Sequence, residues 1–191
     1  MTGQDRPFAN YRWGWFVVLS LVGGVGLTLC DRVHLEYRVL KQAGEPLFSQ
    51  AAWVFPSFVL MSAIALLGFR ALHQPLARLR EPFSLGRAVW SMLAFFAVYA
   101  STGPFAEHGW KLAALLGTFW LLRLALRPDR PALIYSLILG LLGPLAEAAN
   151  SAAGNFHYLH PDLGLVPSWL PMIYLHGGLM VAAWDAGLDR G

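Results

Sequence analysis

The chain has 191 residues, of which 57% are hydrophobic and 13% are charged, about half the charged share of an ordinary soluble domain. This composition argues against a soluble globular protein and indicates a single membrane domain. The 14 Lys and Arg residues exceed the 11 Asp and Glu residues by only three, and they are scattered among short segments, so no nucleic-acid partner is expected. A single cysteine, Cys30, excludes an intramolecular disulfide and a cysteine-based metal site.

Six apolar stretches approach the roughly 20 helical residues that a bilayer core of about 30 Å requires. They are apolar at consecutive rather than alternate positions, which excludes the strands of a lipid-facing barrel. Their approximate bounds are 13–30, 51–69, 88–106, 112–126, 131–152 and 166–184. We therefore predict an all-α polytopic integral membrane protein, with six transmembrane helices in one domain. The first stretch is long for a signal core and no small-residue cleavage site follows it, so we expect a retained span.

The basic residues predict the orientation of these helices. Ten of the 14 fall at the two ends of the chain and in the second and fourth loops, namely Arg6, Arg12, Arg70, Arg78, Arg80, Arg87, Arg123, Arg127, Arg130 and Arg190. By the positive-inside rule both termini then lie in the cytoplasm. An even number of spans is consistent with this, because it places both termini on the same side of the membrane. We expect the side chain of Arg123, near the end of the fourth stretch, to extend to the membrane surface.

Three polar residues within the apolar stretches are candidate ligand contacts. Glu147 and Asn150 are spaced to share one helical face, and an ionisable residue in a span is a functional candidate by default. They fit a contact to a bound head group or a proton site, or else an interfacial position near the end of the span. His176 stands beside Gly177-Gly178, where the glycines allow a ligand to approach. Alternatively, His176 hydrogen-bonds across a helix contact.

The sequence holds no pattern that assigns catalysis. His157 and His160 have the spacing of metal ligands, but Pro161 favours a loop there and no companion ligands stand elsewhere, so no metal site is expected. We find no nucleophile–base pair, P-loop or glycine-rich dinucleotide turn. No catalytic residue and no cofactor are therefore predicted.

Prolines inside or near four of the stretches predict helix kinks, which open cavities between helices. These are Pro56, Pro104, Pro144 and Pro171. Glycines of the first stretch predict a close-packing face, which is also compatible with a homo-oligomer.

Two segments resemble the insulin-induced gene (Insig) family. Tyr158 to Pro171, with the sequence YLHPDLGLVPSWLP, is similar in residues and spacing to the family's Y-x-x-P-D-x-x-x-V-x-S-W-L-P run, and Gly177-Gly178 follows it as in the family's last span. Leu47 to Pro56, LFSQAAWVFP, resembles the family's F-S-x-A-W-W-V-P entry into its second span. These pieces occur in the family's order. The resemblance therefore covers the chain from about residue 47 to its end.

The resemblance implies six helices around a lipid or sterol site and no enzymatic reaction. It places Tyr99, an aromatic of the third span, and Trp120, the tryptophan of the fourth, at that site. Eukaryotic members of the family hold sterol-sensing membrane proteins in the endoplasmic reticulum, and Asp129 looks like the family's partner-binding aspartate. An alignment without a gap would place Arg127 there instead.

The chain also departs from the family's pattern. Ser57-Phe58-Val59 replaces the family's paired cysteines and glycine, and His176 stands where a small residue is usual. The short termini and the high Leu, Ala and Arg usage indicate a bacterial homologue, hence a bacterial inner membrane. A eukaryotic member would lie in the endoplasmic reticulum membrane.

The leading hypothesis is a non-catalytic membrane protein that binds a sterol or a diacylglycerol-like lipid in an intramembrane cavity. Its candidate ligand residues are Tyr99, Trp120, Glu147, Asn150 and His176. The alternatives are a small integral-membrane enzyme of lipid metabolism, using Glu147 with one of the two nearby histidines, and a transporter using Glu147.

Overall fold

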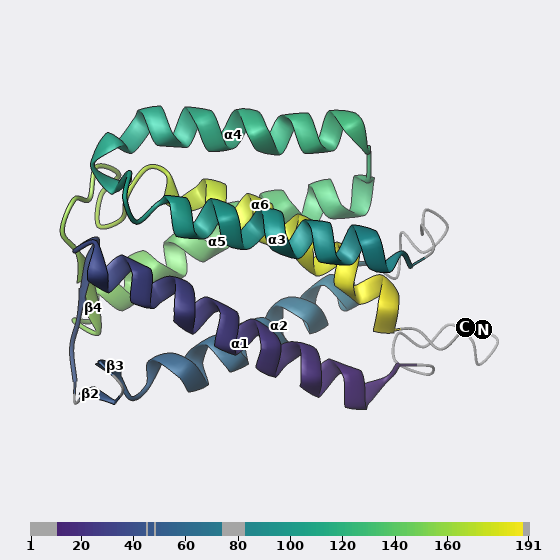
Figure 1. Cartoon of the computed structure of the whole chain (residues 1–191), viewed down its shortest axis with the longest axis horizontal. Helices are drawn as coiled ribbons and strands as arrows, with labels where there is room; N and C mark the ends of the chain where they lie inside the picture. The colour runs from purple at the N-terminus through teal and green to yellow at the C-terminus, as the bar shows by residue number, and fades with distance from the viewer. Residues whose placement is uncertain (1–10, 45, 48, 74–82, 189–191) are drawn as a thin grey trace.

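The protein is a bundle of six α-helices that run roughly along one common axis (Figure 1). The computed structural model describes residues 11–44, 46–47, 49–73 and 83–188. The helices are α1 (Trp13–Glu36), α2 (Val54–His73), α3 (Leu85–Ser101), α4 (Gly109–Leu126), α5 (Arg130–Ala152) and α6 (Leu170–Asp185). The predicted all-α membrane fold with six helices is confirmed.

Helix α6 lies at the centre of the bundle. It packs against α2, α3, α4 and α5, and ten of its 16 residues are buried, whereas α4 buries four of 18. Four helical segments are long and apolar enough to cross a membrane, namely Trp13–Glu36, Val54–Leu72, Ala106–Leu126 and Arg130–Ala152, and α3 is a shorter apolar helix of 17 residues. Because α6 is surrounded by protein rather than lipid, its shorter length leaves no backbone exposed to hydrocarbon.

Four helix boundaries differ from the prediction by more than three residues, and one of them is the end of α2, at His73 instead of residue 69. The first helix continues past Asp31 to Glu36, because the Asp31 side chain is buried and hydrogen-bonded instead of marking the membrane surface. The third helix ends at Ser101, before Gly103-Pro104, where proline disfavours the helical conformation of the preceding residue. The last helix begins four residues late, because residues 166–169 form a turn ahead of it.

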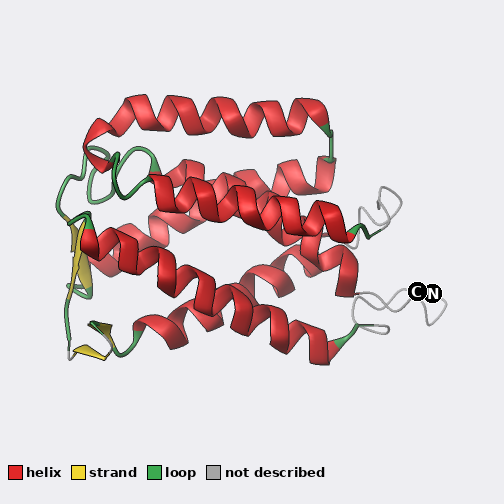
Figure 2. Ribbon diagram, in the orientation of Figure 1, coloured by secondary structure: helices red, strands yellow, loops and turns green. Residues whose placement is uncertain are grey.

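Short strands close one end of the bundle, where only loops were predicted (Figure 2). Strand β1 (Leu40–Gln42) pairs antiparallel with β4 (Phe156–Tyr158), with Leu40 opposite Tyr158. Strand β2 (Pro46–Leu47) pairs with β3 (Gln50–Ala51). The β1–β4 ladder fastens the loop after α1 to the loop before α6.

The other end of the bundle holds both ends of the described chain. The Arg12 backbone N–H donates to the Leu188 carbonyl at 2.9 Å, and the end of α2, the start of α3 and the α4–α5 connection lie at the same end (Figure 1). A buried ion pair joins Arg70 of α2 to Asp185 of α6 at 3.4 Å. The chain therefore crosses the bundle an even number of times. Of the basic residues that predict its orientation, Arg6, Arg78, Arg80 and Arg190 lie outside the described residues.

The prolines do not act as predicted. Pro56 and Pro171 fall in the first turns of α2 and α6, where proline removes no intrahelical hydrogen bond. Pro104 lies in the turn before the short 3₁₀ helix Ala106–His108. Pro144 in α5 is the proline that stands inside a described helix, so a hypothesis of kinks in four spans is wrong.

The orientation of the bundle predicts a labelling pattern. In a background without the buried Cys30, His157→Cys in β4 is expected to react with a membrane-impermeant maleimide on intact cells. Arg127→Cys, in the α4–α5 connection at the opposite end, is expected to react only after the cells are opened. The reverse pattern would place both termini outside the cytoplasm.

Two adjacent glycines of α6 predict opposite tolerance to a methyl group. A Cβ on Gly178 would lie 2.5 Å from the backbone Cα of Ser136 in α5, whereas a Cβ on Gly177 would lie 3.4 Å from the Phe95 ring, an ordinary contact. We expect Gly178→Ala to lower the free energy of unfolding by about 1–3 kcal/mol and Gly177→Ala to leave it unchanged or raise it, since alanine favours helix. Equilibrium denaturation in mixed detergent micelles measures both. Equal changes in the free energy of unfolding of the two variants would contradict the close packing of α6 against α5 at Gly178.

Candidate functional site

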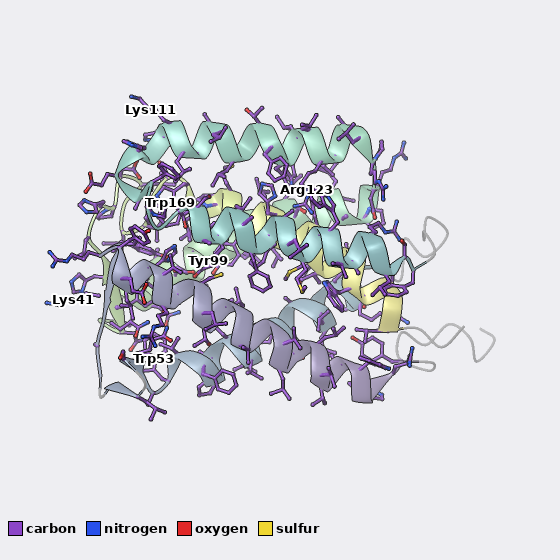
Figure 3. The ribbon with its side chains drawn as sticks, in the orientation of Figure 1. Lys41, Trp53, Tyr99, Lys111, Arg123 and Trp169 are labelled. Carbon is purple, nitrogen blue, oxygen red and sulfur yellow. The ribbon has the colours of Figure 1, made fainter. Side chains whose placement is uncertain are left out.

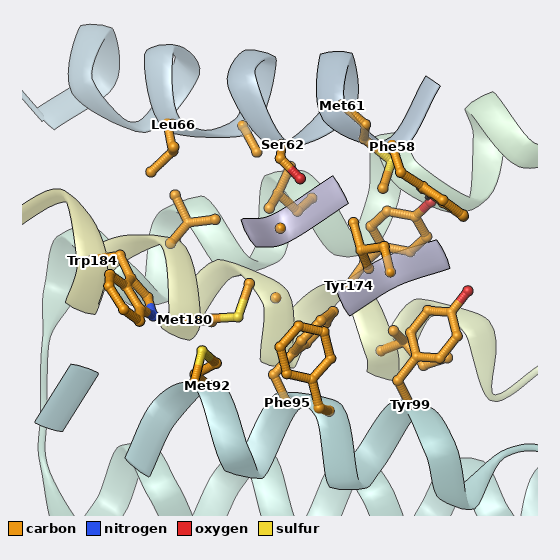
Figure 4. Close-up of a pocket in the computed structure, with 18 of the residues that line it drawn as sticks. Phe58, Met61, Ser62, Leu66, Met92, Phe95, Tyr99, Tyr174, Met180 and Trp184 are labelled. Atoms are coloured by element: carbon orange, nitrogen blue, oxygen red, sulfur yellow. Dashed lines mark hydrogen bonds between the residues drawn. The ribbon is translucent and has the colours of Figure 1, made fainter. Parts of the chain in front are cut away.

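A largely apolar cavity lies between α1, α2, α3 and α6 (Figure 4). Its volume is about 110 Å³, and it is partly open at its side. Its apolar lining includes Leu66, Phe58, Phe95, Met92, Met180 and Trp184.

A polar cluster occupies one end of this cavity. The Tyr158 hydroxyl donates to one oxygen of Glu147 at 2.5 Å, and the Tyr174 hydroxyl donates to the other at 2.7 Å. Tyr158 lies in β4, and burial, together with the Glu147 carboxyl, raises its pKa well above the usual 10. The phenol therefore keeps its proton and remains a donor. Tyrosines from a strand and from α6 thus fix the carboxyl group of α5 at the edge of an apolar space.

Tyr99 stands beside this cluster and faces the cavity (Figure 4). The His34 ring of α1 stacks on Tyr99 with centroids 4.8 Å apart, and His34 Nε2 lies 2.7 Å from the Thr102 hydroxyl oxygen. Since the Thr102 hydroxyl donates to the Tyr99 carbonyl at 2.6 Å, His34 Nε2 must carry the proton. No described side chain hydrogen-bonds the Tyr99 hydroxyl, which leaves it available to a ligand.

Sequence reasoning missed a second buried carboxyl, Asp31 of α1. Gln42 of β1 and Gln50 of β3 both donate to its Oδ2, the second at 3.3 Å. Gln50 also donates to the Thr28 carbonyl at 3.1 Å. The loop after α1 therefore folds back to satisfy Asp31.

A signal for this face was present in the sequence. The buried positions of α1 are Ser20, Gly24, Leu27, Cys30, Asp31 and His34, and most recur at intervals of three or four residues, the spacing of one helical face. Asp31 and His34 continue this face past the point where the charge was expected to end the span.

Two of the five predicted ligand residues line the cavity, Tyr99 and Glu147. Asn150 lies one turn beyond Glu147 and is exposed. It donates to the Ala146 carbonyl at 3.1 Å and accepts a hydrogen bond from Asn155. Asn150 therefore belongs to the end of α5 and not to the cavity lining.

The other two predicted residues lie beyond α6, away from the cavity. His176 is fully buried. Its Nε2 lies 3.1 Å from the Leu116 carbonyl of α4 and its Nδ1 lies 2.8 Å from Arg123 Nη1, so Nε2 carries the proton and Nδ1 accepts from the arginine. His176 therefore hydrogen-bonds across a helix contact, which is the second of the two roles expected from the sequence. Trp120 is buried on α4, and its indole N–H has no hydrogen-bond partner among the described residues.

Arg123 does not extend to the membrane surface as predicted. Its guanidinium turns into the bundle (Figure 3), where it bonds His176 and donates to the Ser91 hydroxyl of α3 at 2.7 Å. The polar atoms of His176 and Ser91 hold the side chain inside, which is why the prediction was wrong.

The remaining candidates have local structural roles. The Asp129 carboxylate accepts from the Ala132 backbone N–H at 2.9 Å and caps α5. His157 and His160 are exposed. His157 alternates with Tyr158 along β4, so its side chain points away from Glu147. Among the described residues, no group of three or more His, Cys, Asp and Glu side chains could hold a metal ion.

The comparison with solved structures identifies the fold. No family model matches the sequence, and no curated protein is similar to it in sequence. The structure matches the crystal structure of a mycobacterial Insig homolog, MvINS from Mycobacterium vanbaalenii. The TM-score is 0.80 at 23% identity, over 93% of this chain and 95% of that chain.

A second match is the structure of a cross-linked trimer of an arginine-to-cysteine variant of MvINS. Its TM-score is 0.81 at 22% identity, over 95% of this chain and 98% of that chain. The fold thus defines a polytopic helical integral membrane protein. More narrowly, it is the fold of the bacterial Insig homologs, and the expected Insig-like architecture is confirmed.

The polar cluster predicts a stability difference between two tyrosine variants. Tyr174→Phe removes the donor of one Glu147 oxygen and is expected to lower the free energy of unfolding by about 1–3 kcal/mol, because a buried acceptor loses its partner. Tyr37→Phe is the control, since Tyr37 is 55% exposed. Equilibrium denaturation in mixed micelles compares them. An unchanged value for Tyr174→Phe would show that the hydrogen bond contributes nothing.

Proposed function

We propose that this protein is a non-catalytic membrane protein that binds one apolar lipid, a sterol or a diacylglycerol-like molecule, in the cavity between α1, α2, α3 and α6. The observation that carries the proposal is the lining of the cavity, which has apolar walls and one polar end formed by Tyr99 and Glu147. A lipid with a long apolar body and a single hydroxyl group matches that arrangement.

The polar end selects the ligand. A lipid already dissolved in the bilayer gains little from apolar burial, so discrimination must come from shape and from a few polar contacts. The ligand hydroxyl is placed between the free Tyr99 hydroxyl and the Glu147 carboxyl, which retains acceptor capacity beyond its two tyrosine donors. Trp120, Asn150 and His176 have no part in this site.

A catalytic or transport role for Glu147 is the less favoured alternative. Both its oxygens already accept from tyrosines, and His157, the nearest candidate base along the chain, points out of the bundle. Glu147→Gln separates the three functions. A binding protein shows no turnover and no flux before or after the change, an enzyme loses turnover, and a transporter loses a flux that depends on pH or potential.

The assembly and location of the protein are part of the same proposal. MvINS has been crystallised as a cross-linked trimer, and we propose a homo-oligomer for this chain as well, in a bacterial inner membrane. The glycines of α1 do not supply the interface, because Gly23, Gly24 and Gly26 face Ser62, Val59 and Phe96 of the same chain. Asp129, at the end of α4 and α5, is the proposed contact for a membrane protein partner.

Filling the cavity is expected to abolish lipid binding. Gly177 lines the cavity, and a Cβ there meets only ordinary contacts, so Gly177→Leu extends into the empty space. We expect it to reduce photo-crosslinking to a diazirine sterol or diacylglycerol probe by about tenfold or more, since the added side chain occupies space that the ligand needs and overpacking costs about 1–3 kcal/mol.

Gly14→Leu is the matched control, because a Cβ at Gly14 meets nothing within 4 Å and Gly14 lies outside the cavity lining. Lipids that copurify with the wild-type protein, identified by mass spectrometry, give the ligand itself. Undiminished labelling of folded Gly177→Leu, or a copurified profile equal to the bulk membrane, would overturn the assignment of this cavity.

A further inference from the structure

A second hollow lies between α3 and α4, on the opposite side of α6 from the cavity. Both helices pack against α6, which forms its floor. Its volume is about 930 Å³, and it opens outward. The residues of α6 that face it include Leu179, Ala182, Ala183 and Asp185, whereas Gly177, Met180 and Trp184 face the cavity. We call this second hollow the α3–α4 groove.

Arg123 is the charged residue of α4 that points into the α3–α4 groove (Figure 3). Its guanidinium bonds only neutral groups, His176 Nδ1 at 2.8 Å and the Ser91 hydroxyl at 2.7 Å. No described carboxylate forms an ion pair with it. A guanidinium carries five N–H donors, so the two observed bonds leave donors for a further acceptor. A half-buried positive charge without an anion is costly in a membrane.

The surrounding charges favour an anion at this place. Arg87 and Arg127 also line the α3–α4 groove. Its two acidic residues have other roles, since Asp185 pairs with Arg70 at 3.4 Å and Asp129 caps α5. Arg123 and Arg127 are therefore guanidinium groups of the groove that no described carboxylate pairs in a salt bridge.

Much of the rest of the α3–α4 groove is apolar. Trp90, Leu122 and Leu126 line it and are 60%, 52% and 73% exposed. A free phosphate ion would leave these side chains uncovered. A lipid with an anionic head group covers them with its acyl chains while its phosphate contacts the arginines.

We propose that the α3–α4 groove binds an anionic phospholipid, whose phosphate is held by Arg123 with Ser91 beside it and whose acyl chains lie along Trp90 and Leu122. Arginine suits a phosphate because its planar N–H groups match two oxygens at once. Basic pockets between transmembrane helices bind anionic head groups in the same manner. This site is separate from the cavity of the proposed function, so either can fail without the other.

Native mass spectrometry of the delipidated protein tests the proposal with two probes of equal acyl chains, dioleoyl phosphatidylglycerol and dioleoyl phosphatidylcholine. The wild type is expected to prefer the anionic lipid, and Arg123→Gln to lose that preference by about tenfold, the usual effect of removing a charged hydrogen bond. Arg123→Lys is expected to retain part of it. Lys111→Gln, an equal loss of charge at the exposed far end of α4, is expected to have no effect.

Three outcomes would overturn the proposal. The first is an equal preference in Arg123→Gln and wild type, and the second is an equal loss in Lys111→Gln, which would indicate general electrostatic attraction. The third is displacement of the lipid by inorganic phosphate at the lipid's own concentration, which would indicate a site for a free anion. Loss of an oligomer in Arg123→Gln with unchanged lipid preference would assign the groove to a second copy of the chain.

A measurement on the wild type keeps the test decisive if Arg123→Gln fails to fold. A diazirine-bearing phosphatidylglycerol is photo-crosslinked to the protein in vesicles, and the adducts are mapped by mass spectrometry. Adducts concentrated in α3 and α4, near Trp90 and Leu122, support the proposal. Adducts spread equally over the exposed faces of α1 and α2 overturn it.

Discussion

The close approach of α6 to α5 at Gly178 is the contact on which the rest of the structure depends. With no side chain at Gly178, the backbone of α6 lies against Ser136 of α5, and this helix pair has the most extensive contact in the bundle. In a membrane, helices associate through such close packing because lipid is as apolar as the helix surface. With α6 fixed at the centre, one of its faces lines the cavity and another lines the α3–α4 groove.

Two sides of α6 lie in different environments, one lining the apolar cavity and the other contacting α4. Gly177 and Met180 face the apolar cavity, whereas His176 lies on the other side and bonds α4. His176 links the guanidinium of Arg123 to the Leu116 carbonyl, so each of its ring nitrogens has a partner. Buried polar groups are costly without such partners. The polar contacts of α6 to α4 therefore position the one arginine that reaches into the bundle from α4.

The sequence predicted the helices well because length and apolarity are local properties. Six helices were expected, and the deviations occur where a tertiary contact overrides a local signal. Asp31 was taken as the end of the first span because a charge normally lies outside the membrane, yet Gln42 and Gln50 satisfy it from a loop folded against α1. No local pattern could reveal that those two glutamines reach back to it.

The candidate site was predicted only in part, for the same physical reason. Tyr99 and Glu147 were identified and do line the cavity. Trp120 and His176 also stand in apolar stretches of the sequence, but the rotation of a helix decides which way a residue points, and a span that is apolar all round carries little information about its rotation. Tyr158 and Tyr174 escaped notice because their role appears only when β4 and α6 bring them to one carboxyl group.

The strands at the end of the bundle explain why the cavity has a polar end at all. In hydrocarbon, a carboxyl group on α5 would need a partner from a neighbouring helix. Here the β1–β4 ladder supplies one from outside the helices, because pairing Leu40 with Tyr158 fixes the strand whose phenol donates to Glu147. The loop that carries β1 also holds Gln42 against Asp31. A single ladder of three residue pairs therefore fixes both the strand that donates to Glu147 and the strand that donates to Asp31, and Glu147 contributes a polar group to the lining of the cavity.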